Sequence, residues 1–143
     1  MHIQIRIRHA ESAELLGLLA MMQEYYAYDE LEFDEATALA ALGDLLADES
    51  LGRIWLICRD TLPIGYIVLT FGYSLEFGGR DAFIDEFYIR AAHRGCGIGA
   101  STLELVEEIA RSMGIRALHL EVEGGNHSAK RFYRSSGFEA VSY

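Results

Sequence analysis

The segment HRGCGIGAS, residues 93–101, restricts the fold of this chain more than any other stretch. Glycine occupies positions 95, 97 and 99, an arginine precedes the first glycine, and a helical pattern follows. Such a loop leaves backbone N–H groups unpaired at the start of a helix, where they and the helix dipole favour phosphate groups. The sequence therefore predicts a strand–loop–helix unit that holds the phosphates of a ligand.

Two nucleotide-binding loops have related glycine patterns, and neither fits this chain. Gly95, Gly97 and Ala100 match the dinucleotide pattern G-x-G-x-x-G/A, and Glu121 stands near the position of its acidic residue. That pattern belongs to the first strand–helix unit of a Rossmann domain, and too few residues follow Gly99 for the units that come after it. A Walker loop is excluded because no Gly-Lys-Ser/Thr sequence follows the glycines.

Composition and charge limit the class of protein and of partner. The 143 residues carry a net charge of −10 and are 51% hydrophobic, so we expect a single folded domain over residues 1–143. The acidic balance argues against nucleic acid as a partner, and no apolar run approaches the roughly 20 residues that span a membrane. Cys58 and Cys96 show neither a disulfide framework nor metal-ligand spacing, so no metal is expected. The N-terminus lacks the apolar stretch of a signal peptide, which indicates a cytoplasmic protein.

Apolar spacing predicts an α/β (α+β) chain in the order β-α-α-β-β-β-α-β-α-β, with a short final strand. Strands are expected near residues 3–7, 53–58, 64–71, 82–90 and 117–122, and helices near 12–26, after 34, after 99 and from 126. Asp34 and Asn126 are expected to cap helices, and Gly137 to end the last one. The apolar stripes of the first two helices are expected to contain Leu15, Leu18, Leu19, Met22 and Tyr26, and Leu39, Leu42 and Leu46.

Residues 94–99 also read R-x-x-G-x-G, and the surrounding sequence extends that pattern. The strand IDEFYIR precedes the loop, a helix and the strand LHLEV follow it, and N-x-x-A-x-x-F-Y-x-x-x-G-F runs from Asn126 to Phe138. Over most of residues 53–138 these segments resemble the GNAT superfamily of N-acetyltransferases, including its two coenzyme A motifs. The resemblance implies a mixed central sheet with helices on both faces, and acetyl-CoA as the ligand of the loop.

The resemblance also implies how the coenzyme is held. In this family the strand before the loop splays from its neighbour, which frees backbone groups to bind the pantetheine arm and the acetyl carbonyl. The glycines let the pyrophosphate approach the loop amides, and Arg94 adds a positive fork, unless it is an ordinary surface arginine. Asn126 is expected to contact the coenzyme arm or only to cap its helix. The residues expected to contact acetyl-CoA are Phe87, Tyr88, Ile89, Arg94, Gly95, Cys96, Gly97, Ile98, Gly99, Ala100, Asn126 and Ala129.

An amine acceptor must lose a proton before it attacks, because a pKa near 10.4 leaves only about one molecule in a few thousand neutral at pH 7. Asp85 and Glu86 lie where polyamine acetyltransferases of this family carry an acidic pair. Adjacent strand residues point to opposite faces, so one of them is expected to reach the site unless a bulge turns the strand, and the distance to Arg94 favours Asp85. The alternative is an ion pair with an arginine such as Arg90. Tyr133 matches the tyrosine that hydrogen-bonds the departing sulfur in the family; its alternative role is packing in the core.

The segment YYAYDELE, residues 25–32, follows the first predicted helix, which forms one wall of the acceptor cleft in the family. Tyrosine faces and carboxylates together suit an ammonium group, so Tyr25, Tyr26 and Asp29 are expected to bind the acceptor. A solvated loop is the alternative. Most of the net negative charge lies in the first 60 residues, which also favours a cationic acceptor. A polyamine, an aminoglycoside or a lysine-like amine would fit.

The sequence thus predicts an N-acetyltransferase that moves acetyl from acetyl-CoA to a primary amine of a cationic acceptor. A non-catalytic module of the same fold that senses acyl-CoA is the alternative. Few residues follow Phe138, where relatives continue into another strand. Either that strand is missing or a second subunit completes the sheet edge in a homodimer, because a bare edge invites pairing.

Overall fold

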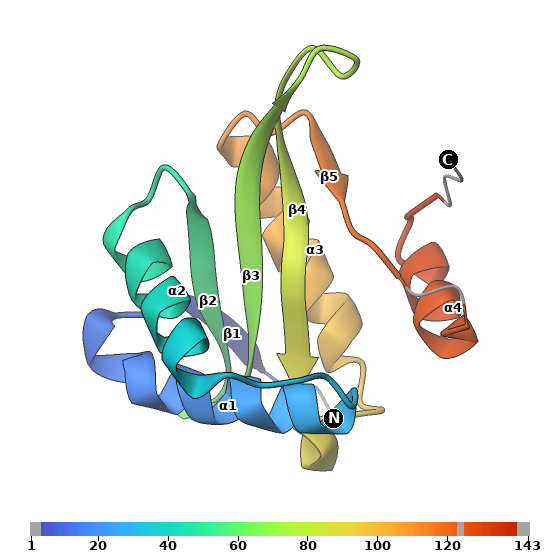
Figure 1. Ribbon diagram of the computed structural model, residues 1–143. Coiled ribbons are helices and arrows are strands. Elements are labelled where there is room, and N and C mark those ends of the chain that lie inside the picture. Colours follow the sequence, from blue (N-terminus) through green and yellow to red (C-terminus); the bar gives the residue numbers. More distant parts are fainter. Residues whose placement is uncertain (1–3, 123–124, 140–143) are drawn as a thin grey trace.

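The computed structural model describes residues 4–122 and 125–139 (Figure 1). Its strands are β1 (Ile5–His9), β2 (Gly52–Arg59), β3 (Leu62–Ser74), β4 (Gly79–Ile89) and β5 (Ala117–His119). Its helices are α1 (Leu15–Tyr28), α2 (Glu35–Ala47), α3 (Ile98–Ser112) and α4 (His127–Ser135), with 3-10 turns η1 (Ser12–Glu14) and η2 (Ala91–His93). No helix in these ranges is long and apolar enough to cross a membrane.

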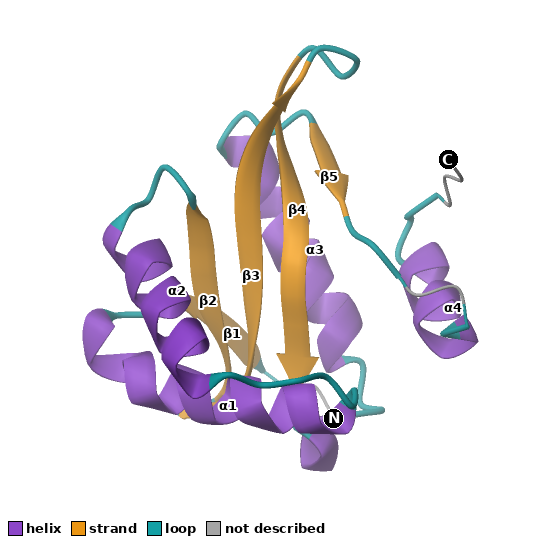
Figure 2. Ribbon diagram, in the orientation of Figure 1, coloured by secondary structure: helices purple, strands orange, loops and turns teal. Residues whose placement is uncertain are grey.

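The five strands form one mixed sheet in the order β1-β2-β3-β4-β5. The first four are antiparallel neighbours, and β5 is parallel to β4. A parallel pair needs a crossover connection, which α3 provides. Helices α1 and α2 lie on one face of the sheet and α3 on the other (Figure 2). This confirms the predicted α/β (α+β) fold with helices on both faces.

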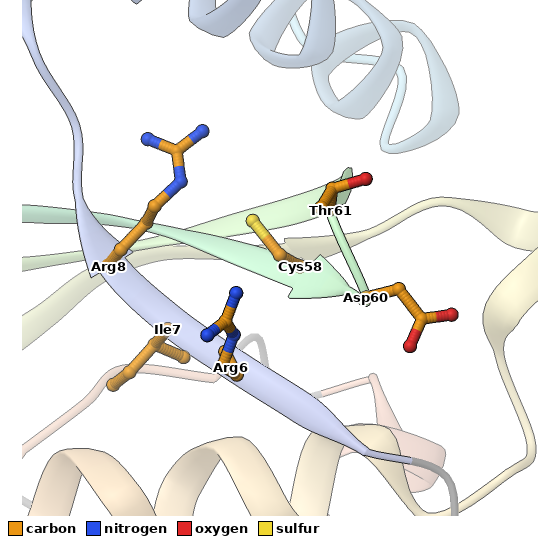
Figure 3. Close-up of a pocket in the computed structure, with 6 residues that line it drawn as sticks. All are labelled: Arg6, Ile7, Arg8, Cys58, Asp60 and Thr61. Carbon is orange, nitrogen blue, oxygen red and sulfur yellow. The ribbon is translucent and has the colours of Figure 1, made fainter.

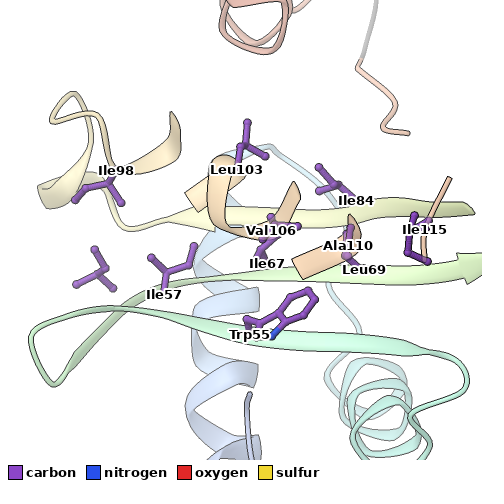
Figure 4. Packing of buried hydrophobic residues seen from close by; sticks show 12 residues of the cluster. Trp55, Ile57, Ile67, Leu69, Ile84, Ile98, Leu103, Val106, Ala110 and Ile115 are labelled. Atoms are coloured by element: carbon purple, nitrogen blue, oxygen red, sulfur yellow. The ribbon is translucent and has the colours of Figure 1, made fainter. Parts of the chain in front are cut away.

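Each face of the sheet has its own hydrophobic core, because alternate residues of β2 and β3 point to opposite sides. Toward α3, the strand residues Trp55, Ile57, Ile67 and Leu69 pack with Leu103, Val106 and Ala110 (Figure 4). Toward α1 and α2, the strand residues Ile54, Leu56, Tyr66 and Val68 pack with Leu18, Leu19, Met21, Ala38 and Leu42. Burial on both faces explains why these strands read as nearly continuous apolar runs.

Local signals predicted the helix ends correctly. The Asp34 carboxylate accepts from the Thr37 N–H at 3.3 Å at the start of α2, and the Asn126 side chain accepts from the Ala129 N–H at 3.1 Å at the start of α4. Gly137, just after α4, has a φ of +97°, which glycine adopts without steric cost.

Some predicted stripes and boundaries are wrong. The stripe of α1 is confirmed for Leu15, Leu18, Leu19 and Met22, which pack in the core between the sheet and the two helices, and Met21, which was not predicted, is buried beside them. Leu39 of α2 is 37% exposed, and its neighbour Ala38 faces the core instead. Strand β5 ends at His119, before the predicted end near residue 122. The predicted short final strand falls after residue 139, outside the described residues.

Candidate active site

A β-bulge in β4 decides which side chains reach the two faces of the sheet. Val68 pairs with Glu86 and Leu69 with Ile84, so Asp85 is an extra residue between the two pairs. Ile84 is buried in the core under α3, whereas Glu86 contacts α1 on the opposite face. Positions 84 and 86 would share a face in a regular strand. The bulge therefore carries Glu86 to the α1 side of the sheet.

Glu86 is half-buried and is held at both carboxylate oxygens. The Tyr26 hydroxyl donates to Oε2 at 2.5 Å, and the Tyr66 hydroxyl donates to Oε1 at 2.8 Å. Burial raises the pKa of the Glu86 carboxyl, the two phenols oppose that rise by stabilising the anion, and the nearby Asp85 adds to it. With a raised pKa, Glu86 is a stronger base than an exposed carboxylate.

Asp85 does not lie against α1, although its distance along the strand from Arg94 predicted that it would reach the site. Its side chain is exposed, and Glu86 is the member of the acidic pair that lies against α1. The contact with α1 favours Glu86 over Asp85, because the bulge, the alternative left open in the sequence, interrupts the regular alternation between Asp85 and Arg94. Arg90 forms its ion pair with neither carboxylate: its Nη2 lies 3.0 Å from Oε2 of Glu24 in α1.

Aromatic rings of α1 and β4 line the same region. The Tyr25 ring lies 5.5 Å from the Tyr26 ring and 5.7 Å from the Tyr88 ring, between centroids. Burial, followed by the negative charges of Asp29 and Glu86, raises the pKa of Tyr25 to about 12. The predicted acceptor residues are thus brought together with Glu86 in a surface of ring faces and carboxylates, which suits an ammonium group.

Strands β4 and β5 separate after three residue pairs. Pairing covers only Asp81–Phe83 of β4, although the strand continues to Ile89. The Arg90 N–H donates to the Ile64 carbonyl in β3. Because the direction of hydrogen bonds alternates along an antiparallel strand, the N–H and C=O groups of Phe87 and Ile89 point away from β3. The predicted splay is present, and the Phe87 backbone faces it.

The glycines of the loop are required for two different reasons. Gly95 and Gly97 have φ values of +77° and +79°, which other residues adopt only with strain, and the space beside them is open. Gly97 caps α3, and its carbonyl accepts the N–H of Ser101, so the amides of residues 98–100 precede the first intrahelical bond. At Gly99 a Cβ would lie 2.9 Å from the Phe132 ring. Gly99 therefore lets α4 approach α3, which the sequence did not indicate.

The remaining loop residues differ in exposure. Cys96 and Ala100 are exposed, whereas the Ile98 side chain is buried in the core, so that its backbone alone can face a ligand. Arg94 is half-buried, and its Nε donates to the Ile89 carbonyl at 2.7 Å. The Arg94 guanidinium is thus engaged with the end of β4.

Helix α4 carries Tyr133 beside this region. The Tyr133 ring packs edge-on against the Phe132 ring, with centroids 5.1 Å apart, and within residues 4–122 and 125–139 its hydroxyl has no hydrogen-bond partner. Burial raises the pKa of Tyr133 to about 12, so the phenol keeps its proton at physiological pH. Tyr133 also contributes to the raised pKa of Tyr25, so the two phenols lie within electrostatic reach of each other.

A separate pocket lies beside β1 and the β2–β3 turn (Figure 3). It is lined by Arg6, Ile7, Arg8, Cys58, Asp60 and Thr61. Arg8 is bonded to both carboxylate oxygens of Glu14, at 2.7 and 2.6 Å. No residue predicted for catalysis or binding lines this pocket. The part of the chain that the structure describes contains no group of three or more His, Cys, Asp or Glu residues that could hold a metal.

Comparison with known proteins decides the family. Residues 16–138 match the acetyltransferase (GNAT) family. The chain belongs to the GNAT acetyltransferase family. This confirms the resemblance found in the sequence. A solved integron cassette protein from the mobile metagenome of the Cole Harbour salt marsh has a similar structure, with a TM-score of 0.85 and 36% identity over 96% of this chain and 85% of that chain.

Two curated proteins show the range of GNAT relatives. Thialysine N-epsilon-acetyltransferase of Bos taurus is 32% identical over 147 residues, which cover 96% of this chain and 86% of that protein. Spermidine/spermine N(1)-acetyltransferase-like protein 1 of Homo sapiens is 27% identical over 142 residues, which cover 92% of this chain. The chain spans only 20% of the length of that human relative.

Tyr66 is a residue of this candidate site that the sequence analysis missed. It is the buried partner of Glu86 and lies opposite Tyr88 in the β3–β4 register, diagonal to Glu86. A buried phenol requires a hydrogen-bond partner, so a tyrosine within the apolar run of residues 64–69 was the available signal. Its partner could be identified only once the register and the bulge were known.

Proposed function

We propose that this GNAT domain transfers the acetyl group of acetyl-CoA to a primary amine of a cationic small molecule or lysine-like acceptor. The observation that carries the proposal is the half-buried Glu86 carboxylate, which two phenols hold beside an aromatic surface and next to the splay of β4. The Bos taurus relative is named a thialysine N-epsilon-acetyltransferase and the human relative a spermidine/spermine N(1)-acetyltransferase-like protein, and both names support the same class of acceptor.

Glu86 is the base in this proposal. The acceptor arrives as an ammonium ion, and the faces of Tyr25 and Tyr26 together with the carboxylate attract its charge. Glu86 then takes a proton from the ammonium, directly or through a water molecule, and releases the neutral amine. The raised pKa of Glu86 reduces the difference in pKa between its carboxyl group and the ammonium ion, which favours this proton transfer. Tyr26 and Tyr66 keep the carboxylate oriented by donating to both of its oxygens.

The neutral amine attacks the thioester carbonyl, a C–N bond forms, and the C–S bond breaks. Negative charge develops on the carbonyl oxygen during the attack. A backbone N–H in the splay, from Phe87 or Ile89, is suited to stabilise it, an effect of roughly 3–4 kcal/mol in related sites. The sulfur leaves with a pair of electrons, and the Tyr133 hydroxyl donates a hydrogen bond to it. Because Tyr133 stays protonated, it is a donor at every working pH.

The glycine loop fits the charged end of the coenzyme. Three amides before the first intrahelical bond of α3, together with the helix dipole, favour a pyrophosphate there. The open space beside Gly95 and Gly97 leaves room for its oxygens. Asn126 fixes the start of α4 and so the position of Tyr133.

An amine panel tests the proposal. The purified chain is mixed with acetyl-CoA and, one at a time, putrescine, spermidine, thialysine, an aminoglycoside and an anionic amino acid. Release of free CoA thiol is followed, and acetyl-CoA binding is measured by calorimetry. We expect thiol release with cationic amines. Binding without release for any amine would favour the non-catalytic acyl-CoA sensor, and absence of binding would contradict both functions.

Four statements stay predictions from the sequence: the cytoplasmic location, the homodimer, the single domain over residues 1–143, and the exclusion of nucleic acid and membrane as partners. The acceptor residues Tyr25, Tyr26 and Asp29 and the coenzyme residues of β4, the loop and α4 are part of the proposal.

A further inference from the structure

Arg94, the first residue of the glycine motif, contacts both strand β4 and the end of helix α1. Its Nε donates to the carbonyl of Ile89, the last residue of β4, at 2.7 Å. Its guanidinium carbon lies 4.3 Å from the centre of the Tyr28 ring and 5.5 Å from that of Tyr88. Both ring distances are within the range of cation–π contacts. Arg94 therefore joins the coenzyme loop to the helix that carries the acceptor residues.

Tyr28 depends on this contact. It is the last residue of α1, and its side chain is 67% exposed. Within the described part of the chain, Arg94 supplies the only ring contact of Tyr28 and its hydroxyl makes no hydrogen bond. After Tyr28 the backbone turns sharply: the Asp29 N–H donates to the Tyr25 carbonyl, and Glu30 has a φ of +56°. A ring clamped at this point fixes the turn that holds Asp29.

The geometry points to Arg94 as a positioning residue for the amine acceptor, acting through Tyr28, rather than as a side-chain clamp on the pyrophosphate. This inference rests on the proposed function for its kinetic consequences. The Arg94 guanidinium holds the C-terminal end of α1 against β4, and so it holds Tyr25 and Asp29 in place beside Glu86. Hydrogen bonds from Arg90 and Tyr88 to Glu24 fix the preceding turn of α1. Arg94 thus supplies the contact at the C-terminal end of the helix.

Four variants separate the two roles of Arg94. Arg94→Gln removes the cation, and Tyr28→Leu removes the ring. Tyr28→Phe keeps the ring and loses only the hydroxyl. Tyr73→Leu is the matched control, because Tyr73 is also an exposed tyrosine, 71% accessible, but lies at the β3–β4 hairpin away from α1. For each variant we measure the KM for the amine and, by calorimetry, the Kd for acetyl-CoA. The KM for the amine is measured again with S-acetylpantetheine as the acetyl donor, because this donor lacks the pyrophosphate.

We expect Arg94→Gln and Tyr28→Leu to raise the KM for the amine by about two- to fivefold each, the effect of an exposed cation–π pair. The double variant should be no worse than Arg94→Gln alone, because Arg94→Gln already removes the contact with Tyr28. Tyr28→Phe and Tyr73→Leu should resemble the wild type, and the effect of Arg94→Gln should persist with S-acetylpantetheine. A tenfold weaker Kd for acetyl-CoA in Arg94→Gln, with an unchanged KM for the amine, would overturn the inference in favour of a pyrophosphate clamp.

Amide hydrogen exchange without substrates tests the contact independently of acetyl transfer. The Asp29 and Leu31 amides donate to the last turn of α1, so both should exchange about two- to fivefold faster in Arg94→Gln and in Tyr28→Leu than in the wild type. Unchanged exchange in both variants would refute the positioning role. If the wild type transfers acetyl to no amine, the proposed function fails, and the exchange rates alone still decide whether Arg94 holds the end of α1.

Discussion

Replacing Glu86 with glutamine removes the charge of the base and keeps the shape of the side chain. The carbonyl oxygen of the new side chain can still accept from Tyr66, and its NH2 group can donate to the Tyr26 oxygen, so the fold should survive. What is lost is the acceptor of the ammonium proton. At pH 7 about one amine molecule in 2,500 is neutral, equivalent to about 4.6 kcal/mol, and a general base typically contributes about 100- to 10,000-fold. We therefore expect kcat/KM for the amine to fall about 100- to 10,000-fold at pH 7.

The pH profile identifies the cause of that loss. Glu86 accepts a proton only when it is ionised, and its pKa is raised, so wild-type kcat/KM should decline with falling pH earlier than an exposed glutamate would cause. Glu86→Gln should lack this acid limb and gain about tenfold per pH unit up to the pKa of the amine, because solvent then supplies the neutral form. Thiol release between pH 4 and pH 10 measures both profiles.

Asp85→Asn is the matched control for this experiment. It removes a neighbouring charge of the same strand from an exposed position, and it should lower kcat/KM less than about threefold, as expected for a screened surface charge. A large loss in Asp85→Asn together with wild-type activity in Glu86→Gln would refute the assignment and show that the bulge presents the other carboxylate to the substrate.

Three further predictions concern the rest of the site. Tyr133→Phe should lower kcat by about 10- to 1,000-fold with an unchanged KM for acetyl-CoA and an unchanged Tm, since the ring still packs on Phe132; wild-type kcat would show that the hydroxyl has no catalytic role. Gly97→Val and Gly99→Val should both weaken acetyl-CoA binding in calorimetry, but only Gly99→Val should also push Phe132 away and so loosen α4, which hydrogen exchange in α4 would show. The folded-state pKa of Glu86 lies above its unfolded value, so the wild type should gain stability relative to Glu86→Gln as the pH falls from 7 to 4, and urea unfolding at both pH values measures the sign.

Sequence reasoning succeeded where the signal is local. A helix cap and a strand–glycine–helix motif each depend on residues a few positions apart, and the structure places Asp34, Asn126 and the loop accordingly. Sequence reasoning failed where two residues far apart in the sequence meet in the fold. The contact of Gly99 with Phe132 joins residues 33 positions apart, and no local pattern distinguishes it from a glycine that faces a phosphate. Tyr66 and Glu86 meet only through the register of β3 and β4.

The bulge at Asp85 connects the separate parts of the candidate site. Before it, Ala82 and Ile84 face the core under α3; after it, Glu86 and Tyr88 face α1, while Phe87 and Ile89 pack against the α3 core. The same segment of β4 has already left β5, which ends its pairing at Phe83. In the proposed reaction, one short stretch of β4 thus offers a carboxylate to the acceptor on one face and backbone groups to the coenzyme at its free edge. If Asp85 instead paired regularly and β4 had no bulge, Glu86 would lie on the face of Ile84 and the base would be separated from the amine. The irregularity of this strand is therefore a requirement of the proposed reaction rather than a defect of the sheet.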